Sequence, residues 1–375
     1  MKIGVITIQR SEVNFGACLQ SYALWKFISN LGHDCEVIDL LRPCHSDYIP
    51  SPSFGEIITS SSHFLDIIKK IYLRLIKQTK NSSGFEKYHQ FNNKVRYSPC
   101  YKSVEELYNN PPAYDILITG SDQVWNPGMP FINEPYFLTF SAKRKKISYA
   151  SSFGVGAIPD NESNNYRKWL TDYSFLSTRE QSGAEIIERL IGKRPQVVVD
   201  PTFLLTKEQW RKEQYPYIGL IPKNYILLYM LHYSEELLLH AERIAHDKGL
   251  PLYFVLSENR KVKSQSTIQL NGIGPAEWMW LIDNSSLLIT NSFHGSAFSI
   301  IFNTPLAVFL EKGNPTNTRI EGLFSTLDMS DHVFDLNTTF DYKQQNFRLN
   351  DNISIKLEDE RKKSIEFLNV AILND

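Results

Sequence analysis

Short apolar runs alternate with amphipathic segments along the second half of this sequence. The segment Glu235 to Lys248 carries apolar residues at helical spacing and ends at Gly249, a typical helix stop. The segment Ala276 to Asn284 has the same character. Such alternation of strands and helices predicts a parallel sheet covered by helices. The predicted strands are Tyr225–Leu231, Leu252–Leu256, Leu287–Thr290 and Leu306–Leu310.

The first half of the chain repeats the pattern. A strand at Lys2–Ile8 is followed by a helix that ends at Gly32 and by a buried strand at Cys35–Leu40, which predicts a βαβ unit. Proline and glycine then interrupt all periodicity at residues 215–222, where we place a domain boundary. Further strands are predicted at Tyr114–Thr119, Ile147–Ser152, Phe175–Thr178 and Gln196–Val199.

These patterns predict an α/β fold with two Rossmann-like βαβ domains that face each other across a central cleft. The N-terminal domain is expected at 1–212 and the C-terminal domain at 223–345. Residues 346–375 are expected to form a tail helix, about Ile355 to Ile372, that packs back on the N-terminal domain. A length of 375 residues agrees with two domains.

Composition narrows the class of protein. With 40 Lys and Arg against 41 Asp and Glu the net charge is -1, so no global field draws the chain to nucleic acid. The 4 cysteines lack CxxC spacing and are typical of core thiols in a reduced cytoplasm, and no metal site is expected. The N-terminus is predicted to form a strand, not a signal peptide, and no apolar run reaches about 18 residues. We therefore expect a cytoplasmic protein.

The segment 56–78 is a candidate for contact with a membrane. It is amphipathic, and basic residues such as Lys69, Lys70 and Arg74 accompany its apolar side chains. The pattern fits either a packed helix with solvated basic residues or a helix that lies on an anionic membrane surface. The second interpretation places the protein at the inner face of the membrane.

The residues Thr290 to Gly295 connect a predicted strand to a helix predicted to start near Gly295. The first N–H groups of a helix lack partners and lie at the positive end of its dipole, so such a turn can hold a phosphate or carboxylate. Ser292 and His294 occupy this turn, and a histidine there can also pass a proton. Alternatively, Asn291 and Ser292 only cap the helix and His294 is a satisfied polar residue beneath it.

Other polar residues follow predicted strands or precede helices. Asn14 lies before a helix in a loop without GxGxxG, which argues against a dinucleotide-binding dehydrogenase. Asp122 follows the strand Tyr114–Thr119 and can act as a base, orient a sugar hydroxyl or simply form an Asx turn. Arg179 and Arg319 lie at junctions with helices, where an arginine can bind a carboxylate or phosphate through two N–H groups.

Short motifs are spread in order over most of the chain: Asn14-Phe15-Gly16, Leu19-Gln20, Tyr22-Ala23-Leu24, Gly120 to Asn126, Tyr149 to Gly154, Arg179-Glu180, Asp200-Pro201-Thr202, Ser292 to Gly295 and Arg319-Ile320. Their order and spacing together resemble the polysaccharide pyruvyl transferase family. The resemblance implies a GT-B-like pair of Rossmann-type domains. It also implies transfer of pyruvate from phosphoenolpyruvate (PEP) to two hydroxyls of a sugar in a cell-surface polysaccharide precursor, giving a cyclic ketal.

This resemblance suggests roles for the residues that bind PEP, which carries a phosphate and a carboxylate. Arg179 and Arg319 are the expected cationic contacts, and Ser292 and Gly295 are expected to add the helix N-terminus. His294 is expected to transfer a proton or contact the phosphate. PEP is a co-substrate, and no further cofactor is expected.

On the acceptor side, Asp122 is expected to orient or deprotonate a sugar hydroxyl. The acceptor is expected to be a sugar, either free of lipid or lipid-linked. Its expected contacts are Asn14, Gln123 and Trp125. The sequence leaves open which sugar it is, the geometry of the ketal and the oligomeric state.

One position departs from the family pattern. Some members have Arg-Leu-His where this chain has Ser292-Phe293-His294. Either Arg319 substitutes for the missing arginine or the donor site is altered. Two other functions fit the same features: a GT-B-type glycosyltransferase with a nucleotide-sugar donor, whose diphosphate would suit the same helix N-terminus, and a sugar-binding protein without catalysis.

Overall fold

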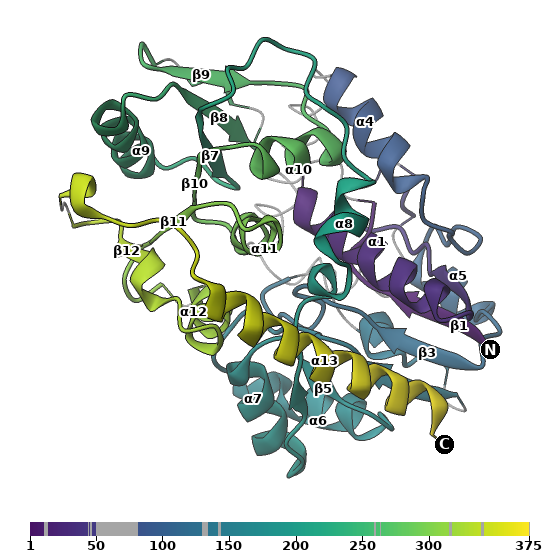
Figure 1. The fold of residues 1–375 in the computed structure, drawn as a ribbon. Coiled ribbons are helices and arrows are strands. Elements are labelled where there is room, and N and C mark those ends of the chain that lie inside the picture. Colours follow the sequence, from purple (N-terminus) through teal and green to yellow (C-terminus); the bar gives the residue numbers. More distant parts are fainter. Residues whose placement is uncertain are drawn as a thin grey trace.

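A computed structural model shows the chain as two parallel sheets with helices packed around them (Figure 1). The structure describes residues 1–10, 14–43, 45, 47–49, 82–129, 134–141, 144–258, 260–262, 264–314, 317–338 and 341–374. The predicted α/β fold with parallel sheets is confirmed, because all the pairings between neighbouring strands in both sheets are parallel.

The N-terminal sheet has the strand order β2-β1-β3-β4. Its strands are β1 (Lys2–Ile6), β2 (Asp34–Val37), β3 (Ile116–Thr119) and β4 (Lys145–Ser148). A short parallel pair, β5 (Ser177–Thr178) and β6 (Gln196–Val197), continues beyond β4 through single bridges such as Ile147 to Phe175. The helices of this half are α1 (Phe15–Asn30), α4 (Ser82–Asn92), α5 (Val104–Asn109), α6 (Ser163–Thr171), α7 (Gln181–Ile191) and α8 (Lys207–Arg211), with 3₁₀ turns η1 (Glu134–Phe137), η2 (Asp160–Glu162) and η3 (Pro201–Leu204).

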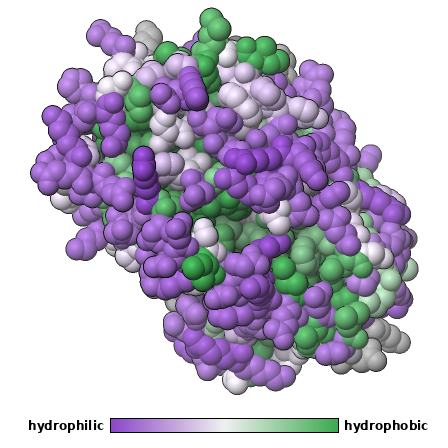
Figure 2. Space-filling view, in the orientation of Figure 1, coloured by the Kyte–Doolittle hydropathy of each residue, from purple (hydrophilic) through white to green (hydrophobic). Residues whose placement is uncertain are grey.

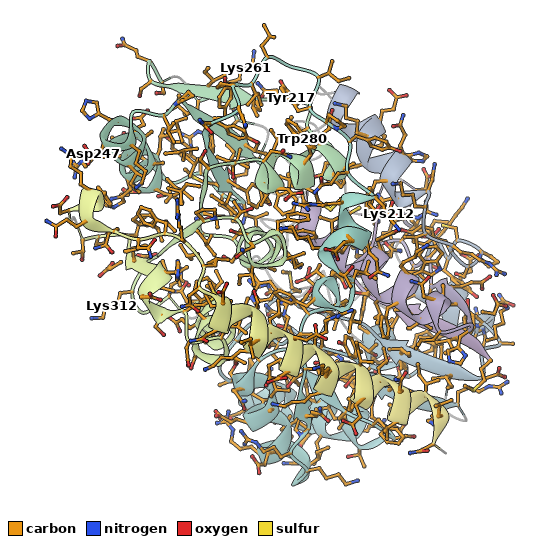
Figure 3. The ribbon with its side chains drawn as sticks, in the orientation of Figure 1. Lys212, Tyr217, Asp247, Lys261, Trp280 and Lys312 are labelled. Carbon is orange, nitrogen blue, oxygen red and sulfur yellow. The ribbon has the colours of Figure 1, made fainter. Side chains whose placement is uncertain are left out.

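The C-terminal sheet has the strand order β12-β11-β10-β7-β8-β9. Its strands are β7 (Ile226–Met230), β8 (Leu252–Leu256), β9 (Thr267–Leu270), β10 (Leu287–Thr290), β11 (Leu306–Leu310) and β12 (Val333–Asp335). The accompanying helices are α9 (Glu235–Lys248), α10 (Pro275–Asp283), α11 (Phe293–Phe302) and α12 (Thr318–Thr326), with 3₁₀ turns η5 (Ser330–His332) and η6 (Tyr342–Gln344). The chain enters this half beyond α8, where Figure 3 labels Lys212, through the loop that carries Tyr217.

One hydrophobic core joins the two halves. Phe15, at the start of α1, stacks on Trp278 of α10 with ring centroids 5.0 Å apart and on Tyr88 of α4 at 5.1 Å. Lys87 of α4 forms an ion pair with Glu277 of α10 at 2.7 Å. This packing fixes the start of α1 against the second sheet, so residues at the carboxyl ends of both sheets can meet.

The last helix, α13 (Asp351–Leu373), returns to the first half of the chain (Figure 1). Ser364 accepts a hydrogen bond from the backbone N–H of Val199 at 3.0 Å, and Arg361 donates to the carbonyl of Leu204 at 3.2 Å. The helix begins four residues before the predicted Ile355 because Asn350 caps it, accepting from Ile353 N–H at 3.2 Å. The domain boundaries at 212, 223 and 345 stay predictions.

The segment 56–78 lies outside the described residues, and its contact with a membrane stays a prediction. Within the part of the chain that the structure describes, none of the helices combines the length and the apolar character needed to cross a bilayer. Hydrophilic residues cover most of the face seen in Figure 2.

Candidate active site

The turn between β10 and α11 is held by its own polar side chains. Ser292 is the N-cap of α11, and its hydroxyl accepts a hydrogen bond from Gly295 N–H at 3.3 Å. The hydroxyl of Thr290 accepts from Ser292 N–H at 3.0 Å. A Cβ on Gly295 would come within 2.8 Å of that threonine oxygen, so the turn requires glycine there. Ser292 and Gly295 thus form a helix cap, and their contact with PEP stays a prediction.

The helix α11 begins at Phe293, two residues before the predicted start, and this places His294 in its first turn. The imidazole packs against the backbone of Gly16 in α1, where an added Cβ would lie 1.9 Å from Nδ1. Gly16 therefore has to be glycine for this approach. Its neighbour Asn14 caps α1 and accepts from Ala17 N–H at 3.2 Å. The first turns of two helices from different halves of the chain meet at this histidine.

Arg179 lies just beyond β5 and is almost completely buried, with 2% of its side chain exposed. Its Nη1 donates to Asp200 Oδ2 at 2.8 Å, and its Nη2 lies 3.7 Å from Asp122 Oδ1. The guanidinium also lies 4.4 Å from the ring centre of Phe293, in cation–π geometry. Burial alone would lower the pKa of Arg179, but the carboxylates of Asp200, Asp122 and Glu180 raise it. The side chain is a permanent, fixed cation.

Asp200 was not predicted as a site residue, although its Asp-Pro-Thr motif contributed to the family resemblance. The carboxylate is fully buried and accepts hydrogen bonds from Ser121 Oγ at 3.0 Å and from the N–H and hydroxyl of Thr202 at 3.0 and 2.9 Å. Burial tends to raise the pKa of Asp200, yet the charge of Arg179 and the hydrogen bonds from Thr202 and Arg179 hold it below its usual value. Asp200 is therefore an anion that fixes Arg179.

His294 lies over this pair, with Nε2 3.8 Å from Asp200 Oδ2 and without a hydrogen-bond partner among the described residues. Burial lowers the pKa of His294, and Arg179 and Arg319 lower it further, while Asp200 and Asp122 oppose the change. The imidazole is therefore neutral near pH 7 and can accept a proton at Nε2.

Asp122, three residues after the end of β3, adopts a left-handed backbone conformation with φ 68°. Its Oδ1 accepts from the N–H of the next residue, Gln123, at 2.9 Å, and the same atom faces both arginines. Arg319 Nη1, in the first turn of α12, lies 3.9 Å from it. With its amide oxygen turned toward α12, Gln123 accepts from Nη1 and Nη2 of Arg319 at 3.2 and 3.1 Å. Burial and the neighbouring Arg179 lower the pKa of Arg319.

The structure thus brings together His294, Asp122, Arg179, Arg319 and Gln123, from both halves of the chain. It places Asn14 two residues from the glycine that touches the histidine. Trp125 lies apart from the group. Its side chain is fully buried, stacks on Phe137 at 5.4 Å and donates its N–H to the carbonyl of Tyr136 at 3.1 Å. Contact between Trp125 and an acceptor stays a prediction.

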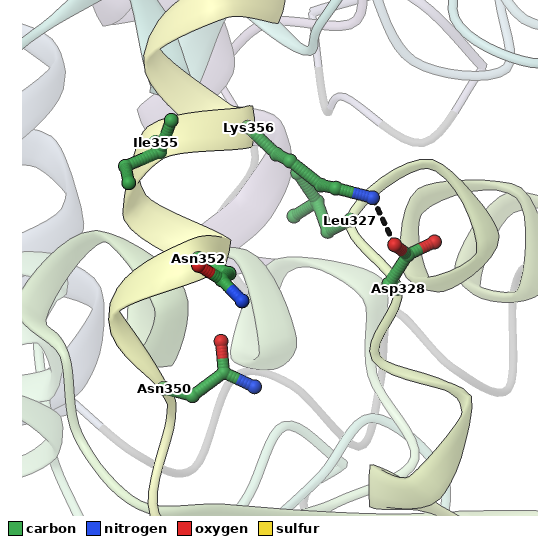
Figure 4. A pocket seen from close by; sticks show the side chains of 6 residues that line it. All are labelled: Leu327, Asp328, Asn350, Asn352, Ile355 and Lys356. Atoms are coloured by element: carbon green, nitrogen blue, oxygen red, sulfur yellow. Dashed lines mark hydrogen bonds and ion pairs between the residues drawn. The ribbon is translucent and has the colours of Figure 1, made fainter.

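A separate hollow lies at the other end of α12 (Figure 4). An ion pair between Lys356 and Asp328 crosses it. None of the predicted site residues lines this hollow. The residues that line it are Leu327, Asp328, Asn350, Asn352, Ile355 and Lys356. In the described ranges, no three His, Cys, Asp or Glu side chains are grouped so as to hold a metal ion.

The lowered pKa of His294 predicts how stability responds to acid. Between the folded pKa and the unfolded value of about 6.5, only the unfolded chain binds this proton, so stability falls as the pH falls. We expect the free energy of unfolding of the wild type to drop more steeply than that of His294→Gln between about pH 7.5 and 5.5. Denaturant titrations at several pH values measure both slopes. Parallel slopes would mean that His294 titrates normally.

Comparisons with known proteins agree with this architecture. The model of the polysaccharide pyruvyl transferase family matches residues 14–312. Among solved structures, the chain is similar to the UDP-GlcNAc 2-epimerase from Neisseria meningitidis bound to UDP-GlcNAc, with 11% identity, a TM-score of 0.50 and coverage of 98% of this chain and 100% of that chain. The chain is also similar to the UDP-GlcNAc 2-epimerase from Methanocaldococcus jannaschii in complex with UDP-GlcNAc and UDP. Here the identity is 12% and the TM-score 0.49, with coverage of 98% of this chain and 99% of that chain. A search of curated proteins finds no match.

A third solved structure, CalG4, the calicheamicin glycosyltransferase, has 10% identity and a TM-score of 0.47, with coverage of 98% of this chain and 94% of that chain. At such identities these similarities concern the fold alone, and the fold is GT-B-like. The family match covers most of the chain. It includes the Asn14 loop, Asp122, Arg179, Asp200 and the His294 turn, and it stops before Arg319. By this match and by the residues within it, the chain belongs to the polysaccharide pyruvyl transferase family.

Proposed function

We propose that this protein transfers pyruvate from PEP to two hydroxyls of one sugar in a polysaccharide precursor and forms a cyclic ketal. The observation that supports it best is that Arg179 and Arg319 both face Asp122, while His294 lies 3.8 Å from Asp200, the carboxylate that pairs with Arg179. PEP is a small, highly charged donor, and a buried site with two fixed guanidinium groups suits its phosphate and carboxylate.

The two arginines differ in how much charge they leave for a ligand. Arg179 is offset by Asp200 at 2.8 Å and has Asp122 and Glu180 within 4 Å. Among the described residues, the only carboxylate within 4 Å of Arg319 is that of Asp122, at 3.9 Å, and 17% of the Arg319 side chain is exposed. We therefore assign the main anion contact to Arg319 and a supporting contact to Arg179. This assignment gives Arg319 the place of the arginine that is missing before Phe293.

The neutral imidazole of His294 suits the proton steps. The first sugar hydroxyl attacks C2 of PEP and forms a C–O bond, while its proton passes to Nε2 and from there to C3, which becomes a methyl group. The second hydroxyl then attacks C2, the bond from C2 to the phosphate oxygen breaks, and the remaining proton leaves with the phosphate. We assign to Asp122 the orientation of these hydroxyls. Atoms and charges balance without an oxidant or reductant.

Thermal unfolding with and without PEP tests this function before the acceptor is known. A ligand at 100 times its Kd stabilises the folded state by about 2.7 kcal/mol, so PEP should raise the unfolding midpoint measurably. Arg319→Ala should remove most of the shift. Arg189→Ala, on the exposed face of α7, is the matched control and should keep it. Stabilisation by nucleotide sugars and not by PEP would favour glycosyl transfer, and no response to either would favour a protein without catalysis.

A further inference from the structure

A second group of polar side chains lies at the carboxyl ends of β1 and β2, and the proposed reaction does not use it. We call Gln9, Arg10, Asp39 and Tyr97 the Arg10 cluster. Arg10 Nη2 lies 2.8 Å from Asp39 Oδ2, and Gln9 donates to Asp39 Oδ1 at 3.2 Å. The guanidinium of Arg10 lies 4.4 Å from the ring centre of Tyr97. The cluster is therefore an ordered, connected group and not a set of independent surface side chains.

The backbone of Arg10 is strained in a way that fixes this side chain. Its φ is 48°, in the left-handed region that a residue with a long side chain rarely adopts. Such strain costs of order 1–3 kcal/mol and is concentrated at ligand sites. Asp39 is only 1% exposed and forms an ion pair with the guanidinium from the buried side, whereas 38% of the Arg10 side chain is exposed to solvent. Arg10 is thus presented outward from a rigid base.

Two polar atoms of the cluster lack partners although they are buried. They are the side-chain oxygen of Gln9 and Nε of Arg10, neither of which has a hydrogen bond among the described residues. Gln9 as a whole is 1% exposed. Leaving a buried donor or acceptor unpaired costs about 1–3 kcal/mol of folding free energy. Such atoms in a folded protein therefore usually bind a ligand or an ordered water.

The cluster lies close to the candidate active site. Thr7, three residues before Arg10, donates its hydroxyl hydrogen bond to the carbonyl of Ser121 at 2.8 Å, and Ser121 precedes Asp122. Three residues of chain span at most about 10 Å. Both groups also lie at the carboxyl edge of the same parallel sheet, where open α/β sheets bind ligands. A single sugar-containing molecule could reach from the cluster to Asp122.

The chemistry of the cluster favours hydroxyl groups over an anion. Asp39 offsets the charge of Arg10 at 2.8 Å, and the free Gln9 oxygen would repel an anion. A hydroxyl both donates and accepts, so it can donate to Gln9 and accept from Arg10 at once. We propose that the Arg10 cluster binds hydroxyl groups of the sugar acceptor and so helps to select it. This proposal rests on the proposed function, and it adds acceptor contacts before the Asn14 loop.

The test measures binding of sugars without turnover. A panel of methyl glycosides of common hexoses and N-acetylhexosamines is titrated into the PEP-saturated protein and followed by saturation-transfer NMR. We expect the wild type to bind at least one glycoside. Arg10→Asn should weaken that binding at least about tenfold, or about 1.4 kcal/mol. Asparagine tolerates the left-handed backbone, so the variant should fold. Gln9→Met, which removes the unpaired oxygen, should weaken binding in the same direction.

The matched control is Arg96→Asn. Arg96 also pairs with carboxylates, Glu36 at 2.9 Å and Asp34 at 2.5 Å, but these lie within β2 and not beyond its carboxyl end. It should leave glycoside binding unchanged, and all three variants should keep the stabilisation by PEP. Equal glycoside binding by Arg10→Asn and the wild type overturns the proposal. So does a wild type that binds PEP but no glycoside. If PEP also fails to bind, the proposed function falls together with this one.

Discussion

Replacing His294 by glutamine should lower kcat by about 10²- to 10⁴-fold and change PEP affinity little, because the variant loses the group that passes the proton but keeps both arginines. Glutamine is close to histidine in size, so the ring's contact with Gly16 is replaced without a large cavity. The measurement is phosphate release from PEP in the presence of the glycoside panel, together with PEP binding by calorimetry.

The control for this prediction is His246→Gln, on α9, whose histidine is 89% exposed and belongs to no described site. It should react like the wild type. If His294→Gln turns over at the wild-type rate, the proton takes another route. If kcat at saturating PEP is unchanged and only PEP affinity falls, His294 contacts the phosphate instead of transferring a proton.

The sequence predicted the buried strands well because their signals are local. The strands β8, β10 and β11 and the helix α9 have the predicted bounds, since continuous apolar runs and a glycine stop mark them. The edge strands β9 and β12 were missed. The residues of β9, Thr-Ile-Gln-Leu, include exposed Ile268 and form no apolar run, because an edge strand has fewer buried faces to fill.

Prediction of the site was limited by contacts that join distant parts of the chain. A position at the end of a strand identified Asp122, Arg179 and His294 as candidates. No local pattern could show that Asp200 lies between the last two, since that arrangement depends on the packing of η3 beneath α1 and α11. Nor could spacing distinguish a tryptophan in a ligand site from Trp125 in the core.

Removing the carboxylate of Asp200 should destabilise the fold strongly. Asp200→Ala leaves the buried Arg179 without its partner at 2.8 Å. It also removes the acceptor of the hydrogen bonds that the hydroxyls of Ser121 and Thr202 donate. Breaking a buried ion pair by removing one partner typically costs about 3–5 kcal/mol, because the remaining charge is uncompensated. We expect a loss of that size in the free energy of unfolding, measured by urea titration. The exposed pair Glu188 and Arg194 gives the control.

In that control, Glu188→Ala should cost about 0–1 kcal/mol, since both partners are 47% exposed and solvent replaces the lost contact. A double variant separates charge from packing. Arg179→Met combined with Asp200→Asn removes both charges and keeps the volume, so it should cost less than the sum of the two single changes, by about 0.5–3 kcal/mol. Strictly additive effects, or an Asp200→Ala cost no larger than that of Glu188→Ala, would show that Asp200 does not hold Arg179. The proposed roles of the two arginines, with Arg319 as the main anion contact and Arg179 as the supporting one, would then lose their basis, because they assume that Asp200 fixes and offsets Arg179.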